Sequence, residues 1–263
     1  MSNEYIGVFL IQRNWVGSVP VANNPKEPTS ATDLLLETGE VVSCDLVPLG
    51  SNYTFLVFVQ GDDEQQLKAI YKPRKGEIPL RDFPSGTLHQ REYVSYLLAN
   101  ALGWYFIPKT VLRDGPHGTG SVQLYVEHNP RNHYFTMREE HYDELRRICL
   151  FDLLANNADR KAGHTLLGDD GQVWGIDHGL TFHPFPKLRT VIWDFADEPM
   201  PEHLIDDLRR FGERLDKADE SVELIIGFLE PIEVEALHLR LEAILDNPVF
   251  PDPSNTYIPW PNI

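Results

Sequence analysis

The chain has 263 residues, 42% hydrophobic and 24% charged, a composition typical of a globular protein that folds without a disulfide or metal. Its 23 basic and 40 acidic residues give a formal net charge of −17, which argues against binding nucleic acid or an anionic membrane surface. Two unpaired cysteines, no apolar run of about 20 residues and no basic secretory leader favour a cytoplasmic protein without a stable membrane anchor.

The first 120 residues are rich in strand-forming residues. β-branched and aromatic runs predict strands over 41–49 and 53–59, with a tight turn at 50–52 between them. The segment 67–73 alternates in polarity, which predicts a strand with Lys68, Ile70 and Lys72 on one face.

A loop over 74–87 leads into a predicted helix at 87–103, with Thr87 as its N-cap and Gly103 as its stop. Strands are predicted at 106–112 and 121–127.

The second half of the sequence is mostly helical. Helical periodicity predicts one long helix over 137–157, followed by a break at 158–164. Two short strands are expected at 164–167 and 172–177, and acidic helices over 194–246. This order predicts an α+β fold with two lobes and a cleft between them.

Two aspartates flank the short strand pair. Asp159 directly follows the long predicted helix, and Asp177 ends the second strand. A phosphoryl-transfer site needs a carboxylate that orients the attacking hydroxyl and oxygen ligands that hold a metal ion against the phosphates. Asp159 suits the first task and Asp177 the second, although a local turn role is the alternative for each. Asp152, seven residues before Asp159, is interpreted as support for this loop.

Lys72 and Glu92 form a second candidate pair. Lys72 ends its predicted strand on the Ile70 face, where it would reach a phosphate, and Glu92 lies in the first turns of the next helix. Two solvated surface charges are the alternative interpretation.

Six blocks in this order resemble the phosphatidylinositol 3-/4-kinase-like family, most closely its type II phosphatidylinositol 4-kinases and more distantly HipA-type kinases. The blocks are GSN before YTFLV, AIYKP, REYVSYLL, GSVQLYVE, DLLANNADR and IDHGLTF. The resemblance implies a two-lobed kinase-like fold. It implies a strand-rich lobe over 1–120, a hinge at 121–127 and a helical lobe over 128–263 with a Pro-rich tail.

The resemblance also implies a role for each matching residue. Ser51 and Asn52 would cover the phosphates, Ile70 would line the nucleotide site, and Lys72, held by Glu92, would bind ATP. The backbone near Gln123 and Tyr125 would face adenine. Asp159 would be catalytic, Arg160 would neutralise phosphate charge, and Asp177 would bind Mg²⁺ or Mn²⁺.

Two departures from the family pattern affect the expected chemistry. The family usually has a metal-binding Asn five residues after the catalytic Asp, where this chain has His164. Imidazole suits Mn²⁺ better than Mg²⁺, so the metal, or the activity itself, would differ. The chain also lacks a cysteine-rich palmitoylation stretch, which together with its acidity disfavours a phosphoinositide substrate.

The sequence thus predicts an ATP-dependent phosphotransferase acting on a protein hydroxyl or a soluble metabolite. One alternative is a non-catalytic ATP-binding module, motivated by His164. Another is a metal-dependent hydrolase built on Asp159, His164, Asp177 and His178. Nucleotidyl rather than phosphoryl transfer is a third.

Overall fold

The computed structural model describes residues 31–48, 52–62, 64–253 and 258–259. The first half forms an antiparallel sheet of five strands in the order β1-β2-β3-β5-β4. The strands are β1 (Glu40–Val47), β2 (Thr54–Gln60), β3 (Gln66–Pro73), β4 (Thr110–Gly115) and β5 (Gly118–Leu124). The strands predicted at 41–49, 53–59 and 67–73 are confirmed within the described residues.

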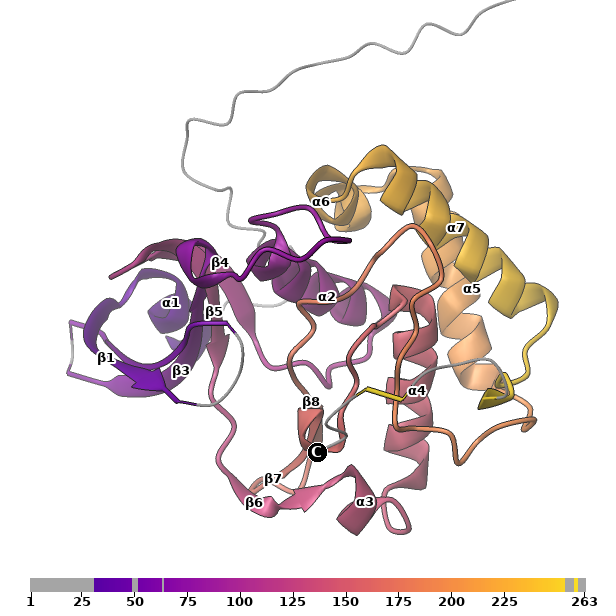
Figure 1. Cartoon of the computed structure of the whole chain (residues 1–263), viewed down its shortest axis with the longest axis horizontal. Helices are drawn as coiled ribbons and strands as arrows, with labels where there is room; N and C mark the ends of the chain where they lie inside the picture. Colours follow the sequence, from indigo (N-terminus) through magenta and orange to yellow (C-terminus); the bar gives the residue numbers. More distant parts are fainter. Residues whose placement is uncertain (1–30, 49–51, 63, 254–257, 260–263) are drawn as a thin grey trace, which may run out of the picture.

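The sheet curves around helix α1 (Ala31–Thr38), as Figure 1 shows. Leu36 of α1 is buried against Val57 and Val59 of β2 and against Ala69 and Tyr71 of β3. The predicted alternation of β3 is confirmed, because Ala69 and Tyr71 face this core while Lys68, Ile70 and Lys72 are only partly buried. The β3 face that carries Lys72 therefore points away from α1.

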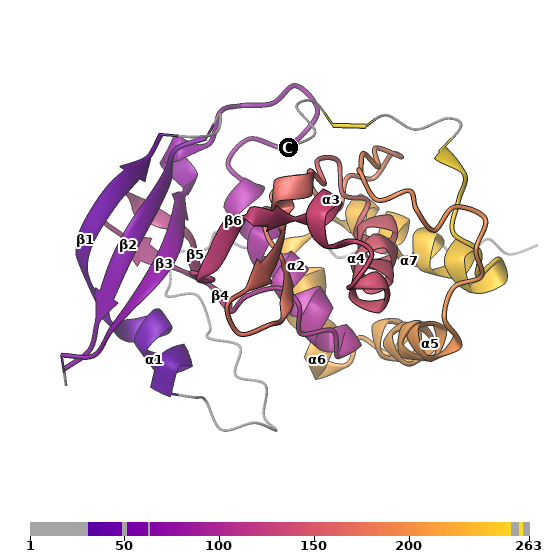
Figure 2. The ribbon, with the colours of Figure 1, turned by 90° about the horizontal axis from the view of Figure 1, so that it is seen from below.

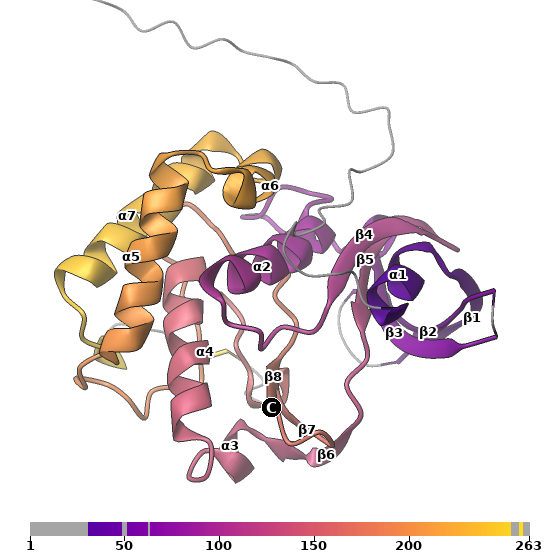
Figure 3. The same cartoon turned by 180° about the vertical axis from the view of Figure 1, so that it is seen from behind.

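Helix α2 (Leu88–Leu102) lies between the sheet and the later helices, as seen from behind in Figure 3. It ends, as predicted, at Gly103, whose φ of 75° is the left-handed conformation that glycine adopts most easily. Thr87 precedes the helix, but its hydroxyl donates to the carbonyl of Pro84 and makes no cap hydrogen bond. The buried carboxylate of Glu77 instead accepts the backbone N–H of His89 at 2.9 Å.

The second half joins a small sheet to a group of helices (Figure 2). The sheet has the order β6-β7-β8. The elements are β6 (His128–His133), α3 (Tyr134–Met137), α4 (Tyr142–Ala155), β7 (Thr165–Gly168), β8 (Val173–Gly175), α5 (Glu202–Asp216), α6 (Glu220–Phe228) and α7 (Pro231–Asp246). One large apolar core joins α2 and α4 to α5, α6 and α7. The fold is thus the two-lobed α+β arrangement that the sequence predicts.

The structure differs from the predicted elements in three places. The helix predicted over 137–157 begins only at Tyr142, because α3 ends at Met137 and a turn at 138–141 follows it. The strand predicted over 106–112 begins only at Thr110, because Pro108 has no N–H to give to a ladder. Strand β6 was not predicted, since its sequence is polar and contains a proline.

A buried ion pair fixes α2 to α7. The guanidinium of Arg91 pairs with the carboxylate of Glu233, and the two side chains are only 3% and 5% exposed. Arg91 also donates to the carbonyl of Thr181 at 2.6 Å. These contacts hold the helix that carries Glu92 against the second half of the chain.

We expect Glu233→Gln to lower the free energy of unfolding by about 3–5 kcal/mol, because it leaves the Arg91 charge buried without a charged partner. Urea unfolding followed by circular dichroism measures this change. Glu235→Gln, at an exposed position of the same helix, is the matched control and should change stability by less than about 0.5 kcal/mol. Equal effects of the two changes would contradict the prediction.

Within the described part of the chain, no helix combines the length and the apolar character needed to span a membrane. Cys149 is buried in the core, and burial raises the pKa of its thiol; Cys44 is partly exposed.

Candidate active site

Lys72 connects the two halves of the molecule. Its ammonium donates to the carboxylate of Glu92 on α2 and, at 2.8 Å, to Oδ1 of Asp177, which follows β8. Burial acts to lower the pKa of Lys72, but the charges of Asp177 and Glu92 outweigh it and raise that pKa above its usual value. The lysine therefore carries its charge at all ordinary pH values.

Glu92 is held from two sides. One carboxylate oxygen accepts from Lys72, and the other accepts the backbone N–H of His178 at 2.8 Å. Its side chain is 5% exposed, and this burial raises its pKa although Lys72 opposes the shift. The pairing of Lys72 with Glu92 is thus a buried contact rather than two solvated surface charges.

Asp177 adopts a conformation that residues other than glycine rarely take, with φ of 58°. Loss of hydration acts to raise the pKa of its carboxyl, but the charge of Lys72 holds that pKa well below its usual range. Its side chain is 45% exposed, so an ionised carboxylate faces open space beside the lysine.

His164 is the last residue of the 3₁₀ turn at Ala162–His164 and faces Asp177. Its Nδ1 lies 2.8 Å from the carbonyl oxygen of Asp159, which can only accept, so Nδ1 carries the proton. Burial lowers the pKa of His164, so the ring is neutral near pH 7. Its Nε2 therefore presents a lone pair 3.3 Å from Oδ2 of Asp177.

Two acceptors that face each other without a shared proton fit a cation bound between them. His164 and Asp177 offer one nitrogen and one carboxylate ligand. Across the described residues, no group of three or more His, Cys, Asp or Glu side chains gathers into a metal site. A divalent cation bound by this pair would take its other ligands from phosphate oxygens and water, which is the usual arrangement at nucleotide sites.

Asp159 lies close enough to His164 and Asp177 for their charges to act on its carboxyl. Its carboxylate is 3.0 Å from the ammonium of Lys161, and its side chain is 26% exposed. Burial raises its pKa, while Lys161 opposes the shift. The side chain of Asn157, which sequence reasoning missed, accepts the backbone N–H of Asp159 at 3.0 Å and fixes the turn. The two consecutive asparagines at the end of the predicted helix were the signal that could have indicated this turn.

The residues expected above the nucleotide are only partly described. Ser51 lies outside the described residues. The side chain of Asn52 accepts the backbone N–H of Ile78 at 2.7 Å, which ties the start of β2 to the loop after β3. Ile70 shares the partly exposed face of β3 with Lys72.

The place of Gln123 contradicts its predicted role at adenine. It lies inside β5, where Ile70 of β3 pairs with it on one side and Thr110 of β4 on the other, so its backbone faces strands. Its side chain donates to Thr110 at 2.8 Å. Tyr125 lies just beyond β5, and its N–H donates to the carbonyl of Lys68 at 3.0 Å.

Arg160 also contradicts its predicted role. Its side chain is fully buried, and the guanidinium forms a two-bond ion pair with Asp152, at 2.8 Å for each bond. A phosphate outside the protein cannot reach it. Asp152, which the sequence interpretation assigned to support of this loop, is the acid that holds Arg160 in place.

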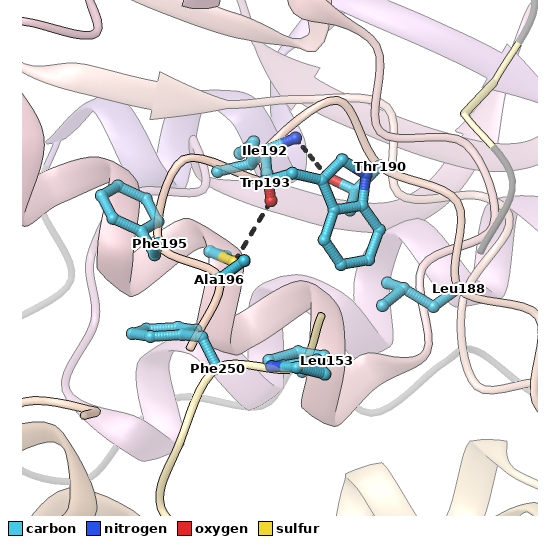
Figure 4. Close-up of a pocket in the computed structure, with 10 residues that line it drawn as sticks. Leu153, Leu188, Thr190, Ile192, Trp193, Phe195, Ala196 and Phe250 are labelled. Atoms are coloured by element: carbon cyan, nitrogen blue, oxygen red, sulfur yellow. Dashed lines mark hydrogen bonds between the residues drawn. The ribbon is translucent and has the colours of Figure 1, made fainter. Parts of the chain in front are cut away.

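Behind α4 lies a small apolar pocket that shares no residue with this cluster (Figure 4). Leu153 and Cys149 of α4 line it together with Trp193, Phe195 and Phe250. Its lining is that of a packing defect in the core rather than of a polar reaction site.

Comparison with known proteins identifies the family. The model of the phosphatidylinositol 3- and 4-kinase family matches residues 102–216. Protein Rv2133c of Mycobacterium tuberculosis is 37% identical over 263 residues, an alignment that covers 86% of this chain and 94% of that protein.

Two solved kinases are similar in structure. A Golgi casein kinase with Mn and ADP bound superposes with a TM-score of 0.52 at 17% identity, over 82% of this chain and 74% of its own. The Helicobacter pylori kinase CtkA gives a TM-score of 0.48 at 16% identity, over 82% of this chain and 94% of its own. The first likeness shows a shared kinase-like fold. The chain belongs to the phosphatidylinositol 3-/4-kinase-like family of kinases.

Proposed function

We propose that this protein is an ATP-dependent phosphotransferase. The observation that carries the proposal is the pair of contacts from Lys72 to Glu92 and to Asp177, residues 20 and 105 positions away in sequence. A lysine held by a helix carboxylate beside a metal-binding aspartate is the arrangement by which kinases hold nucleotide phosphates.

Each residue has one task in this proposal. Lys72 binds phosphate oxygens, and Glu92 orients its ammonium. Asp159 accepts a hydrogen bond from the acceptor hydroxyl and takes its proton as the acceptor oxygen bonds the γ-phosphorus of ATP, while the bond from that phosphorus to the β–γ bridging oxygen breaks and ADP leaves. Tyr125 and the segment that follows it connect the two lobes and line the adenine side, and Asn52 lies above the phosphates.

Asp177 and His164 would hold Mg²⁺ or Mn²⁺. A metal ion bound there neutralises charge on the phosphates. The imidazole ligand favours Mn²⁺ over Mg²⁺, which prefers oxygen. The Golgi casein kinase solved with Mn and ADP supports this pairing of metal and nucleotide on a similar fold.

The acceptor would be a protein hydroxyl or a soluble metabolite. A net charge of −17 disfavours phosphoinositide in an anionic membrane, and it disfavours nucleic acid as well. The alternatives are ATP binding without transfer, nucleotidyl transfer, and metal-dependent hydrolysis by Asp159, His164, Asp177 and His178, although Nε2 of the buried His178 lies against Arg160.

Thermal unfolding of the wild-type protein tests the proposal. We expect the melting temperature to rise only when nucleotide and metal are both present, and to rise more with Mn²⁺ than with Mg²⁺. A ligand at one hundred times its Kd adds about 2.7 kcal/mol to the stability of the folded state. A rise with metal alone and none with nucleotide would contradict the proposal and favour the hydrolase.

A further inference from the structure

The guanidinium of Arg160 uses all of its N–H groups inside the protein. Nε and Nη2 donate to Asp152. Nη1 donates to the carbonyl of His164 at 2.9 Å and to that of Ile176 at 3.1 Å. Nη2 also lies 2.7 Å from Nε2 of His178. A guanidinium with five fixed donors is therefore saturated by three separate chain segments.

These segments carry the two residues that face each other as metal ligands. Arg160 bonds the backbone of His164 itself. It also bonds Ile176 and His178, the two neighbours of Asp177. The backbone N–H of His178 is in turn held by Glu92. Asp177 thus lies between Ile176 and His178, and hydrogen bonds from buried side chains hold both of these residues in place.

These contacts on both sides of Asp177 are consistent with its unusual backbone conformation. Its φ of 58° is a conformation that persists in residues other than glycine only where the surroundings impose it. Nothing in the side chain of Asp177 itself imposes it, because Lys72 and His164 contact only the carboxylate.

We propose that Arg160 is a positioning residue that sets the distance between the Asp177 carboxylate and the His164 imidazole. The inference rests on the proposed function, since it concerns the metal-binding pair. This positioning role takes the place of the predicted one, in which Arg160 would neutralise phosphate charge. Lysine would not substitute, because its single ammonium cannot match the carboxylate of Asp152 and reach three further acceptors.

Removing the arginine alone would leave Asp152 as a buried unpaired carboxylate, which is enough to unfold many proteins. The test therefore uses the double variant Arg160→Met with Asp152→Asn. It removes both buried charges, and the new Asn retains an oxygen for the bond that Asn157 donates to position 152 at 2.9 Å. Arg113→Met is the control, since Arg113 is a half-buried arginine that bonds the carbonyls of Leu36 and Gly39, far from the site.

The readout is binding of Mn²⁺ in the presence of ADP, followed by the electron paramagnetic resonance of free Mn²⁺. We expect the folded double variant to bind Mn²⁺ at least about tenfold more weakly than wild type, the usual effect of losing a group that orients metal ligands. Arg113→Met should bind as wild type does. Wild-type affinity in the folded double variant would overturn the inference, whereas no Mn²⁺ binding by the wild type would overturn the proposed function instead.

A second measurement needs no variant and decides the matter if the double variant does not fold. Because Nη2 of Arg160 can only donate, Nε2 of His178 must accept, and the ring proton must lie on Nδ1. Long-range ¹H–¹⁵N spectra of the wild type report this tautomer directly. A proton on Nε2 of His178 would show that the contact with Arg160 does not exist, and the inference would fall.

Discussion

A Lys72→Met variant is expected to retain about one hundredth or less of the wild-type rate of ATP turnover, and to bind ADP more weakly. Losing one preorganised charge at a site where negative charge develops typically costs 10²- to 10³-fold. The methionine keeps the length and apolar stem of the lysine but leaves the carboxylates of Glu92 and Asp177 facing each other without a cation. Release of ADP, with the melting temperature in ADP and Mn²⁺ alongside, measures both effects.

Lys68→Met is the matched control for this variant. Lys68 lies on the same face of the same strand and pairs with Glu127, but the two side chains are 41% and 58% exposed. An exposed ion pair of this kind contributes about 0–1 kcal/mol. We therefore expect nearly wild-type turnover, and similar losses in both lysine variants would mean that the effect lies in the surface charge of the sheet.

The strand that carries Lys72 was predictable because local polarity and packing agree. Each second residue of 67–73 is apolar, and the sheet has one face against α1, so alternation alone sets which side chains lie on the opposite face with Lys72. Periodicity alone did not place Glu92, because α2 is buried on most of its sides and its buried residues include Arg91 as well as Glu92. The pairing of the two needed the order of the family blocks as well.

The turn between α3 and α4 was not predictable from local signals. Residues 138–141 contain neither Gly nor Pro, and they continue the helical pattern of their neighbours. The break is explained by tertiary packing, because Tyr134 and Met137 of α3 and Leu145 and Ile148 of α4 are all buried in the same core. Propensity is a weak constraint where packing decides.

The burial of Arg160 was hidden for a similar reason. The local sequence of an arginine beside a candidate catalytic aspartate is the same whether its side chain faces a phosphate or the protein interior. What decides is the acid eight positions earlier on α4, which draws the guanidinium inward. The position of Gln123 was mispredicted for a different reason. The end of a strand cannot be located to within two residues from its sequence, and Gln123 lies inside β5 rather than beyond its end.

An Asp159→Asn variant is expected to turn over ATP about 10²- to 10⁴-fold more slowly while binding ADP and Mn²⁺ with nearly unchanged affinity. The amide has the shape of the carboxylate but cannot take a proton from an acceptor hydroxyl, and general-base catalysis contributes a factor of this size. Asp169→Asn, at an exposed position in the turn between β7 and β8, is the control. Wild-type turnover by Asp159→Asn would remove Asp159 from the mechanism.

The two variants together separate the competing functions, because each function assigns binding and chemistry to different residues. In a phosphotransferase, Lys72→Met weakens nucleotide binding as well as turnover, whereas Asp159→Asn weakens turnover alone. In a module that only binds ATP, Lys72→Met still weakens binding, and the wild type has no turnover for Asp159→Asn to lose. In a metal-dependent hydrolase, Lys72→Met leaves catalysis intact and Asp159→Asn loses metal. Since Lys72 contacts Asp177 at 2.8 Å and Asp159 does not share that contact, these patterns follow from the geometry of the site.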